Sequence, residues 1–236
     1  MTDEARQPLD ADEGTIDISK DPGRPDFVVD GAPGAMLIII SGPSGVGKDT
    51  IIDEMRRIER EEGREGERTY VVTMTTRSQR PGEVDGVDYH FVDHDTFLRI
   101  RDARGFLEAN EVHGTKNWYG SPRDQVREAL VSGRDVILKI DVQGAQVVKE
   151  QVSEALLIFV VPPTMETLFQ RLVARATETA DELEIRQRNA ALELARQDDY
   201  DHVVVNETGQ VERTARLIDR IIAEEHLKEP DRRVRV

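Results

Sequence analysis

The segment GPSGVGK at residues 42–48 sets three glycines around a single lysine. A continuous apolar run, MLIII, precedes it, and an amphipathic stretch, IIDEMRRIERE, follows it. A glycine-rich turn from a strand into a helix directs backbone N–H groups at one point, where the helix N-terminus adds partial positive charge. Glycines allow phosphate oxygens to approach closely, and Lys48 supplies a cation. The pattern G-x-x-x-x-G-K therefore predicts a loop that binds the polyphosphate of a nucleotide, and a plain connecting turn is the alternative.

The next residue, Asp49, departs from this pattern, which has Ser or Thr at that position. The usual hydroxyl binds Mg²⁺, and a carboxylate is also a hard oxygen ligand. We therefore predict that Asp49 contacts Mg²⁺ directly or through water. The alternative is an exposed acid that stabilises the helix N-terminus. Thr50 also offers a hydroxyl, but one position further along the helix it points elsewhere.

A second group of polar residues lies in TMTTRSQRPGEVDGVDYHFV, residues 73–92. The guanidinium groups of Arg77 and Arg80 and the hydroxyl of Tyr89 can converge on a second phosphate through charge-assisted hydrogen bonds. The RPGE sequence, which ends at Glu83, predicts a tight turn between them. Two neighbouring arginines are more often a solvated surface, so this second anion site depends on the presence of the first.

Charge and composition exclude several classes of protein. The 236 residues carry a formal net charge of −15, which argues against broad electrostatic binding to nucleic acid or to an anionic membrane. The sequence has no cysteine, so it forms no disulfide and no thiolate metal site. It has no apolar run of the roughly 20 residues that span a bilayer, and no secretory signal pattern. We expect a cytoplasmic protein that binds neither nucleic acid nor membrane, and the oligomeric state stays open.

Apolar runs and amphipathic stretches alternate along the chain and predict the elements that position these residues. We expect strands at 35–41, 68–74, 87–93, 105–114, 117–121, 134–142, 155–161 and 201–206. We expect helices from Gly47 onward and at 93–104, 121–133, 143–152, 163–175, 181–196 and 210–226. This alternation predicts an α/β fold with a parallel sheet. Residues 73–121 break the rhythm and predict an inserted subdomain, in which 87–93 would belong to an antiparallel part.

Six segments together resemble a known family: GPSGVGK, TTRSQRPGEVDGVDYHFV, FLEANEVHGTKNWYGS, KIDVQGAQ, RLVARATET and VVVNE. Their order and spacing are those of the guanylate kinases, over about residues 36–224. The resemblance implies a three-layer P-loop NTPase fold with a central parallel sheet, an inserted mixed α+β GMP-binding subdomain and a helical lid. It implies transfer of the γ-phosphoryl group of ATP to GMP or dGMP, with Mg²⁺ as cofactor.

The expected boundaries follow from this resemblance and from composition. An acidic disordered tail would cover 1–34, the kinase-like domain 35–226 and a C-terminal tail 227–236. Inside the domain, the core would comprise 35–72, 122–174 and 191–226, the GMP-binding subdomain 73–121 and the lid 175–190.

The resemblance also implies a role for individual residues. ATP would be bound by Gly42, Pro43, Ser44, Gly45, Val46, Gly47, Lys48, Asp49, Thr50, Arg171 and Asn206. The GMP phosphate would be held by Arg77, Arg80, Tyr89 and Tyr119, and Glu83 would also belong to the GMP-binding residues. The guanine would be read by Thr73, Glu108 and Ser121. Asp141 would lie near GMP and, with Asp49, near Mg²⁺. The transferring phosphoryl group would be stabilised by Lys48, Arg175 and Arg186.

The physics of guanine agrees with the part given to Glu108. The N1–H and N2–H₂ edge of guanine donates two hydrogen bonds, and one carboxylate accepts both. Adenine presents no such pair of donors, so this one acid can select the base. Without the resemblance, Glu108 is equally an acid at a strand edge, and Tyr119 an ordinary packing residue.

Three further departures from the family pattern stand out. Lys139 occupies a position where many members have an acid, Ala176 replaces a glycine at the start of the lid, and the stretch around 114–118 is about two residues longer than usual. Two alternatives remain. A ribose 1,5-bisphosphate phosphokinase would not be expected to keep the TTR…RPGE…DY segment. A noncatalytic peptide-binding module typically loses the phosphate loop, whereas Lys48 is present here.

Overall fold

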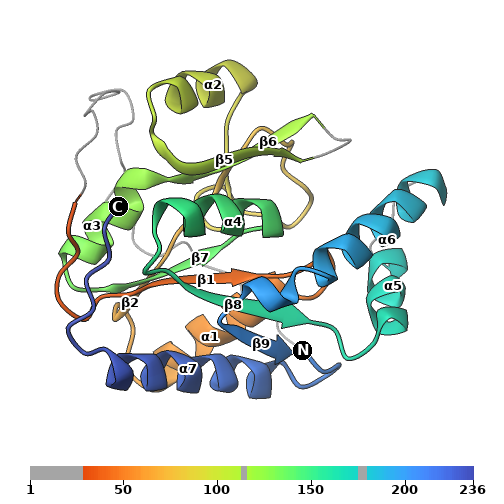
Figure 1. Ribbon diagram of the computed structural model, residues 1–236. Coiled ribbons are helices and arrows are strands. Elements are labelled where there is room, and N and C mark those ends of the chain that lie inside the picture. The colour runs from red at the N-terminus through yellow and green to blue at the C-terminus, as the bar shows by residue number, and fades with distance from the viewer. Residues whose placement is uncertain (1–28, 113–115, 175–179) are drawn as a thin grey trace. The chain divides into compact units, whose positions relative to one another are not determined.

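The computed structural model describes residues 29–112, 116–174 and 180–236, and Figure 1 shows it as a ribbon. Within these residues the chain forms two compact units, one of residues 72–122 and one of residues 29–71 and 123–236. The smaller unit covers the stretch where the sequence predicts an inserted subdomain.

The larger unit is built on a parallel sheet with the strand order β2-β7-β1-β8-β9. Its strands are β1 (Leu37–Ser41), β2 (Arg68–Tyr70), β7 (Asp135–Lys139), β8 (Leu156–Val161) and β9 (His202–Val205). Strand β1 lies in the middle and is buried along its whole length, as expected for an apolar strand that is covered on both faces.

Helices cover both faces of this sheet and make three layers. They are α1 (Lys48–Glu61), α3 (Arg123–Val131), α4 (Val142–Gln151), α5 (Met165–Ala174), α6 (Ala180–Leu194) and α7 (Val211–Lys228), with a 3₁₀ turn at Gln197–Asp199. In Figure 1, α1 and α7 lie on one face of the sheet and α4 on the other. The predicted α/β fold with a central parallel sheet is confirmed.

The main core of the larger unit lies between the sheet and the pair α1 and α7. Ile51, Met55 and Ile58 recur at helical spacing on α1 and are buried against alternate residues of β1, among them Ile38 and Ile40. Burying a side chain of this size contributes roughly 1.5–3 kcal/mol. This packing anchors the two ends of the segment that contains the GPSGVGK loop.

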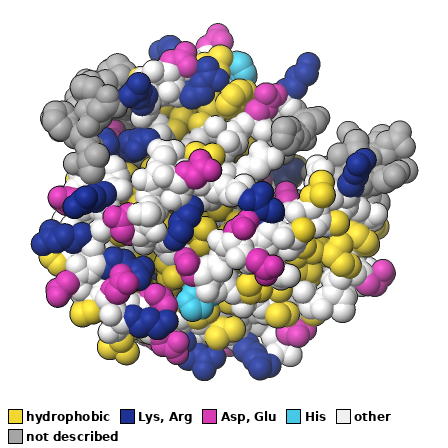
Figure 2. All heavy atoms as spheres, in the orientation of Figure 1, with side chains coloured by type: hydrophobic (Ala, Val, Ile, Leu, Met, Phe, Trp, Pro, Cys, Tyr) yellow, Lys and Arg dark blue, Asp and Glu magenta, His cyan; other side chains and the backbone are white. Residues whose placement is uncertain are grey.

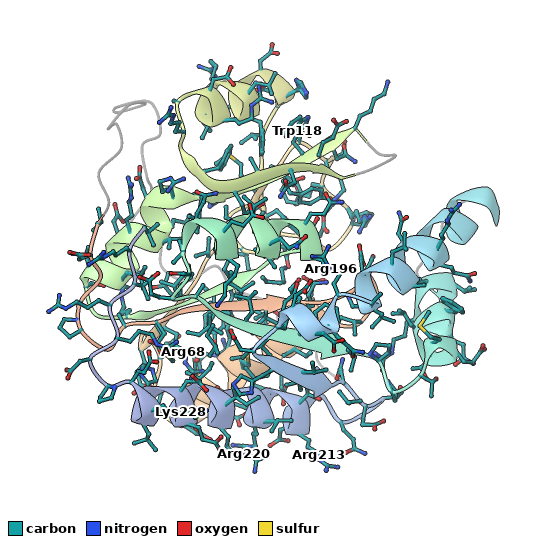
Figure 3. The ribbon with its side chains drawn as sticks, viewed as in Figure 1. Arg68, Trp118, Arg196, Arg213, Arg220 and Lys228 are labelled. Atoms are coloured by element: carbon teal, nitrogen blue, oxygen red, sulfur yellow. The ribbon has the colours of Figure 1, made fainter. Side chains whose placement is uncertain are left out.

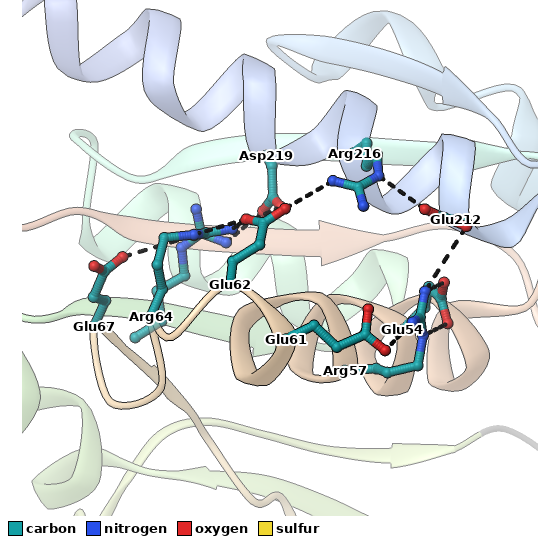
Figure 4. A network of polar contacts seen from close by, with 10 residues as sticks. Glu54, Arg57, Glu61, Glu62, Arg64, Glu67, Glu212, Arg216 and Asp219 are labelled. Carbon is teal, nitrogen blue, oxygen red and sulfur yellow. Dashed lines mark hydrogen bonds and ion pairs between the residues drawn. The ribbon is translucent and has the colours of Figure 1, made fainter.

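A polar network ties α1 to α7 and to the edge strand β2 (Figure 4). Arg68 bonds to Glu59 at 3.1 Å and to Asp219, and Tyr70 donates to Glu59 at 2.6 Å. Burial is the main reason that the pKa of Glu59 is raised. Arg216, on α7, reaches Glu62 at 2.9 Å in the exposed part of the network.

Exposed charges cover the outer surface of this unit. Figure 3 shows Arg213 and Arg220 pointing away from the sheet on α7. On the face drawn in Figure 2, Lys and Arg side chains are interspersed with Asp and Glu. No helix in the described part of the chain combines the length and the apolar character that crossing a membrane requires.

The smaller unit has a second sheet, with the order β4-β3-β6-β5. Its elements are β3 (Met74–Thr75), β4 (His90–Phe91), α2 (His94–Asp102), β5 (Phe106–Val112) and β6 (Asn117–Pro122). The carboxylate of Asp93 caps α2 by accepting from the N–H of Thr96 at 2.7 Å.

One face of this sheet is apolar and packs against α2. The rings of Phe97 and Phe106 stack at 4.5 Å. Trp118, which Figure 3 labels, lies 5.9 Å from Phe97. Gly120 makes this packing possible, because a Cβ atom there would lie 2.9 Å from the ring of Phe106. Since side chains alternate along a strand, the neighbours of Met74 and Gly120 point to the opposite face, which is polar.

Two strand predictions are wrong in detail. The single strand expected at 68–74 is two strands, with β2 in the larger unit and β3 in the smaller one, because an apolar run does not show where the chain leaves a sheet. The segment at 87–93 was expected in an antiparallel part, but its short strand β4 pairs parallel with β3. A long loop with positive φ at Gly82 and Gly86 connects these strands and makes the parallel pairing possible.

Both predicted tails extend too far into the chain. Residues 1–28 lie outside the described residues, but Val29 exchanges two backbone hydrogen bonds with Val236, at 2.9 and 3.1 Å. The N–H of Gly31 donates to the carbonyl of Val234 at 2.8 Å, and both C-terminal valines are buried. The alternation V-R-V at 234–236 is a strand pattern, and it outweighs the mixed charge that suggested a tail.

Candidate active site

The three glycines of the GPSGVGK loop cannot be replaced without strain, because their φ angles are positive and neighbouring side chains or backbone atoms leave no room for a Cβ atom. Gly42, Gly45 and Gly47 all have positive φ, at 140°, 83° and 102°. A Cβ atom on Gly45 would lie 2.8 Å from the side chain of Leu172, and one on Gly47 would lie 2.6 Å from the amide nitrogen of Asn206. The loop therefore has a conformation that only glycine allows at these positions.

Lys48, the first residue of α1, folds back over the loop. Its ammonium group donates to the carbonyl oxygens of Gly42 and, at 3.2 Å, of Pro43. Burial lowers the pKa of Lys48, and Glu193, Asp49 and Asp141 act in the opposite direction. The cation predicted for a nucleotide phosphate is thus present at the loop.

Two residues predicted to lie on the ATP side support the loop from behind. The side chain of Asn206 donates to the carbonyl of Val46 at 2.8 Å, and Arg171 donates to the same oxygen at 3.1 Å. Arg171 also bonds to the carbonyl of Asn206 and to Thr208. Ser44 and Thr50 are exposed at the loop and in the first turn of α1.

The carboxylate of Asp49 forms an ion pair with the ammonium group of Lys139. Asp49 lies in the first turn of α1 and Lys139 at the end of β7. The two residues that depart from the expected pattern in this region are therefore in direct contact.

The N–H of Ser44 donates to Glu193, a residue of α6, at 3.3 Å. Burial raises the pKa of Glu193, while Lys48 and this N–H oppose the shift. Sequence reasoning missed Glu193, because it is 149 residues from Ser44 and no local pattern distinguishes it from the other acids of α6.

Asp141 caps α4 by accepting from the N–H of Gly144 at 2.7 Å. No group of three or more His, Cys, Asp or Glu that could hold a metal ion is found within the described ranges. Mg²⁺ in nucleotide sites commonly uses one or two carboxylates together with phosphate oxygens, so a complete protein cage is not needed.

The smaller unit brings together the predicted anion-binding residues around Arg77. The guanidinium group of Arg77 is held by both oxygens of Glu83, at 3.0 and 2.8 Å, and bonds to the hydroxyl of Tyr119 at 3.1 Å. It also lies over the ring of Tyr89, 5.4 Å from its centroid. Arg80 is exposed, and its backbone N–H donates to Glu83 at 2.8 Å. Glu83 thus orients Arg77 and fixes the RPGE turn.

A second polar cluster surrounds Glu108 on the same sheet. Glu108 is 5 % exposed, and its two oxygens accept from Ser121 at 2.6 Å and from Asn110 at 2.9 Å. The hydroxyl of Thr73 is buried and has no hydrogen-bond partner within the described residues. Asn110 was missed from the sequence, although it lies two positions after Glu108 and therefore points to the same face of the strand.

The lid residues cannot be placed in the same way. Arg175 and Ala176 lie outside the described residues, as does the side chain of Arg186 on α6. Residues 113–115, in the longer stretch at 114–118, also lie outside them, while β5 and β6 pair up to Val112 and Asn117 on either side.

Comparison with known proteins identifies the family. The guanylate kinase family model matches residues 34–225. The chain is 45 % identical over 170 residues to a guanylate kinase of Mycobacterium sp. (strain MCS), covering 72 % of this chain and 83 % of that protein. It is 43 % identical over 191 residues to the guanylate kinase of Streptococcus pneumoniae, covering 81 % and 88 %. The chain belongs to the guanylate kinase family.

Two further relatives agree with this assignment. Guanylate kinase 2, chloroplastic/mitochondrial, of Oryza sativa is 40 % identical over 205 residues, covering 86 % of this chain and 69 % of that protein. The crystal structure of guanylate kinase from Anaplasma phagocytophilum superposes with a TM-score of 0.64 at 31 % identity, covering 84 % of this chain and 88 % of that one. As a guanylate kinase, the chain is a nucleotide kinase that uses ATP.

Proposed function

We propose that this chain transfers the γ-phosphoryl group of ATP to GMP, and to dGMP, with ADP and GDP or dGDP as products. Residues 42–50 bind ATP, and the unit at 72–122 binds the acceptor. The observation that carries this proposal is the coexistence of an intact phosphate loop around Lys48 with a buried, hydrogen-bonded acid at Glu108, in a chain of this family.

The base is selected by Glu108. Ser121 and Asn110 hold its side chain in place. The carboxylate therefore loses little conformational entropy when it accepts hydrogen bonds from the N1–H and N2–H₂ groups of guanine. The buried hydroxyl of Thr73 can form a further hydrogen bond with the base. A site that is built to accept from two donors rejects a base that lacks them.

The GMP phosphate is bound by Arg77 and Arg80, together with the hydroxyls of Tyr89 and Tyr119. Glu83 holds Arg77 in a fixed orientation through two hydrogen bonds, so it is a positioning residue and does not bind the phosphate itself. A planar guanidinium group held in this way binds phosphate oxygens with high directionality.

Catalysis consists of positioning and electrostatic stabilisation. An oxygen of the GMP phosphate attacks the γ-phosphorus in line, and the bond to the β-phosphate oxygen breaks, which releases ADP. The attacking phosphate is already anionic, so no protein nucleophile or strong general base is needed. Lys48 stabilises the charge on the transferring group, and we assign the same role to Arg175 and Arg186 when the lid closes and excludes water.

The residues around Lys48 fit an Mg²⁺ ion that arrives with ATP. Asp49 and Asp141 both act electrostatically on Lys48, and both offer the hard oxygen donors that Mg²⁺ prefers. These two carboxylates would hold the ion directly or through water, and it would neutralise phosphate charge there. A cytoplasmic site of action stays a prediction that localisation of the protein would test.

A coupled assay with ATP and purified protein tests the proposal. Lys48→Met should abolish turnover of GMP, because the variant removes the cation of the loop. The control is Lys149→Met on α4, which removes an ammonium group that bonds to the carbonyl of Ala155 and should leave turnover unchanged. Equal activity of both variants would contradict the assignment of the loop.

A further inference from the structure

We propose that Lys139 is a positioning residue that balances the charge of Asp49, and that this ion pair allows a phosphate-binding loop to carry a carboxylate in place of a hydroxyl. The inference deepens the proposed function, because it concerns the same ATP site. It assigns Lys139 to the ATP-binding machinery, although Lys139 lies on a different strand from the loop and 90 residues from Asp49 in sequence.

The sheet brings these residues together. Strands β1 and β7 pair in parallel, with Lys139 opposite Ile40, close to the end of β1 from which the loop begins. The side chain of Lys139 is 19 % exposed and that of Asp49 is 58 % exposed, and the ammonium group donates to the carboxylate. The pair therefore lies at the edge of the ATP site, within reach of solvent.

The surrounding charges explain why such a partner is needed. The charged groups that act most strongly on Lys48 are the carboxylates of Glu193, Asp49 and Asp141 and the ammonium group of Lys139. Without Lys139, these three acids would be opposed by one cation fewer, beside a loop that must accept the polyanionic phosphates of ATP. Like charges in proximity disfavour binding, so an unbalanced Asp49 would repel the nucleotide.

The two departures from the family pattern also compensate for each other. A neutral hydroxyl is replaced by an acid at Asp49, and the acid found in many members is replaced by a base at Lys139. The first change makes the site more negative by one charge and the second makes it more positive by two, so Lys139 more than offsets the carboxylate of Asp49. This predicts that the effects of the two substitutions are strongly nonadditive.

A double-mutant cycle tests the proposal directly. Binding of ATP is measured by calorimetry for the unchanged protein, Lys139→Met, Asp49→Ser and the double variant, both with Mg²⁺ and with EDTA. Lys139→Met should weaken ATP binding about fivefold, in the range of a partly exposed ion pair. In the Asp49→Ser background the same substitution should change binding less than twofold, on the order of experimental scatter.

Further measurements separate charge balance from folding. Lys139→Arg keeps the charge and should bind ATP as the unchanged protein does, and Lys139→Gln replaces Lys139→Met if that variant fails to fold. Turnover assays should show that Lys139→Met raises the KM for ATP and leaves the KM for GMP unchanged. Lys149→Met is the matched control, because it removes another lysine of the larger unit and should leave ATP binding unaffected.

Two results would overturn the inference. One is an equal loss of ATP binding on removing Lys139 with and without Asp49. The other is coupling that appears only with Mg²⁺, which would show that Lys139 acts through the bound metal and does not balance the charge that Asp49 presents to ATP. Failure of the proposed function would look different, because the unchanged protein would then bind ATP but fail to phosphorylate GMP.

Discussion

Replacing Glu108 by Gln should remove the ability of this guanylate kinase to distinguish GMP from AMP. Glu108 has about four acceptor positions on its two oxygens, and Ser121 and Asn110 each occupy one of them. A carboxylate has only acceptor positions, so every hydrogen bond that it forms with the two donors of guanine is one that it accepts. A glutamine in the same place has one acceptor oxygen and one amide donor.

The neighbours also determine how that glutamine would be oriented. If Asn110 keeps its present donor toward position 108, the oxygen of the new side chain faces Asn110, and the hydroxyl of Ser121 turns to accept from the new NH₂ group. One donor of guanine then meets an N–H group. The loss of a charge-assisted hydrogen bond and the unpaired donor together cost about 3 kcal/mol, which corresponds to a decrease on the order of 100-fold in kcat/KM for GMP.

The assay compares kcat/KM for GMP and AMP at a saturating concentration of ATP. AMP should lose nothing, because adenine does not offer the pair of donors that Glu108 accepts, so the ratio of GMP to AMP should fall by the whole factor. Glu111→Gln is the matched control, since it makes the same change at an exposed position of the same strand. Its kcat/KM values should stay within about twofold of the unchanged protein.

Two results would refute this reasoning. If Glu108→Gln keeps its activity with GMP, Glu108 does not read the base. If GMP and AMP lose activity equally, Glu108 maintains the fold or the phosphate site, and the selection of guanine lies elsewhere.

Three more predictions concern stability and the loop. Arg68→Met should lower the free energy of unfolding by about 3 kcal/mol in urea denaturation, because it leaves the buried carboxylate of Glu59 without its cation, and a loss under 1 kcal/mol would contradict this. Gly47→Ala should weaken ATP binding by roughly 5- to 150-fold, which corresponds to about 1–3 kcal/mol of backbone strain, because the new Cβ displaces Asn206. Unchanged binding in calorimetry would count against the tight loop. Burial raises the pKa of Glu193, so the folded state binds a proton on this carboxyl group more tightly than the unfolded state does. This protonation stabilises the fold at low pH, and the stabilisation is lost as pH rises from the ordinary carboxyl pKa through the raised pKa of the folded state. Glu193→Gln should therefore raise the Tm near pH 7 but bring no such gain near pH 4, about the ordinary carboxyl pKa, and an equal shift at both pH values would be inconsistent with this cause.

The phosphate loop could be predicted from the sequence because its glycines and Lys48 are close together in the chain. The glycines are needed for the backbone conformation of the loop, and Lys48 is needed as the cation. The parallel sheet could be predicted for a similar reason, since buried strands such as Leu37–Ser41 are short and uniformly apolar. In both cases the residues that form the pattern are neighbours in the sequence, and they form one loop or one strand in the structure.

Contacts between distant segments could not be predicted in this way. Asp49 and Lys139 each depart from the family pattern, but their ion pair depends on the pairing of β1 with β7, which cannot be predicted from either segment alone. The N–H of Ser44 meets Glu193 from α6 for an equally nonlocal reason. Arg171 was assigned to ATP by resemblance, whereas its contact with the carbonyl of Val46 shows a supporting position behind the loop.

The smaller unit could be predicted only in part. Its place in the chain could be predicted from the break in strand and helix alternation, but the pairing of its strands could not. The bulge between Phe106 and Glu108 sets which side chains of β5 face Ser121, and a one-residue shift there would reverse the polar and apolar faces. Only the register of the sheet reveals that Asn110 joins the cluster.

The most direct test of the central claim is a profile of phosphoryl acceptors with purified protein and Mg·ATP. GMP, dGMP, AMP and ribose 1,5-bisphosphate are compared at equal concentrations, with ADP formation and the phosphorylated product both measured. We predict that GMP and dGMP are converted to their diphosphates and that AMP and ribose 1,5-bisphosphate react at least 100-fold more slowly, on the order expected from a missing donor pair. Phosphorylation of ribose 1,5-bisphosphate in preference to GMP, or no conversion of GMP at all, would contradict the account.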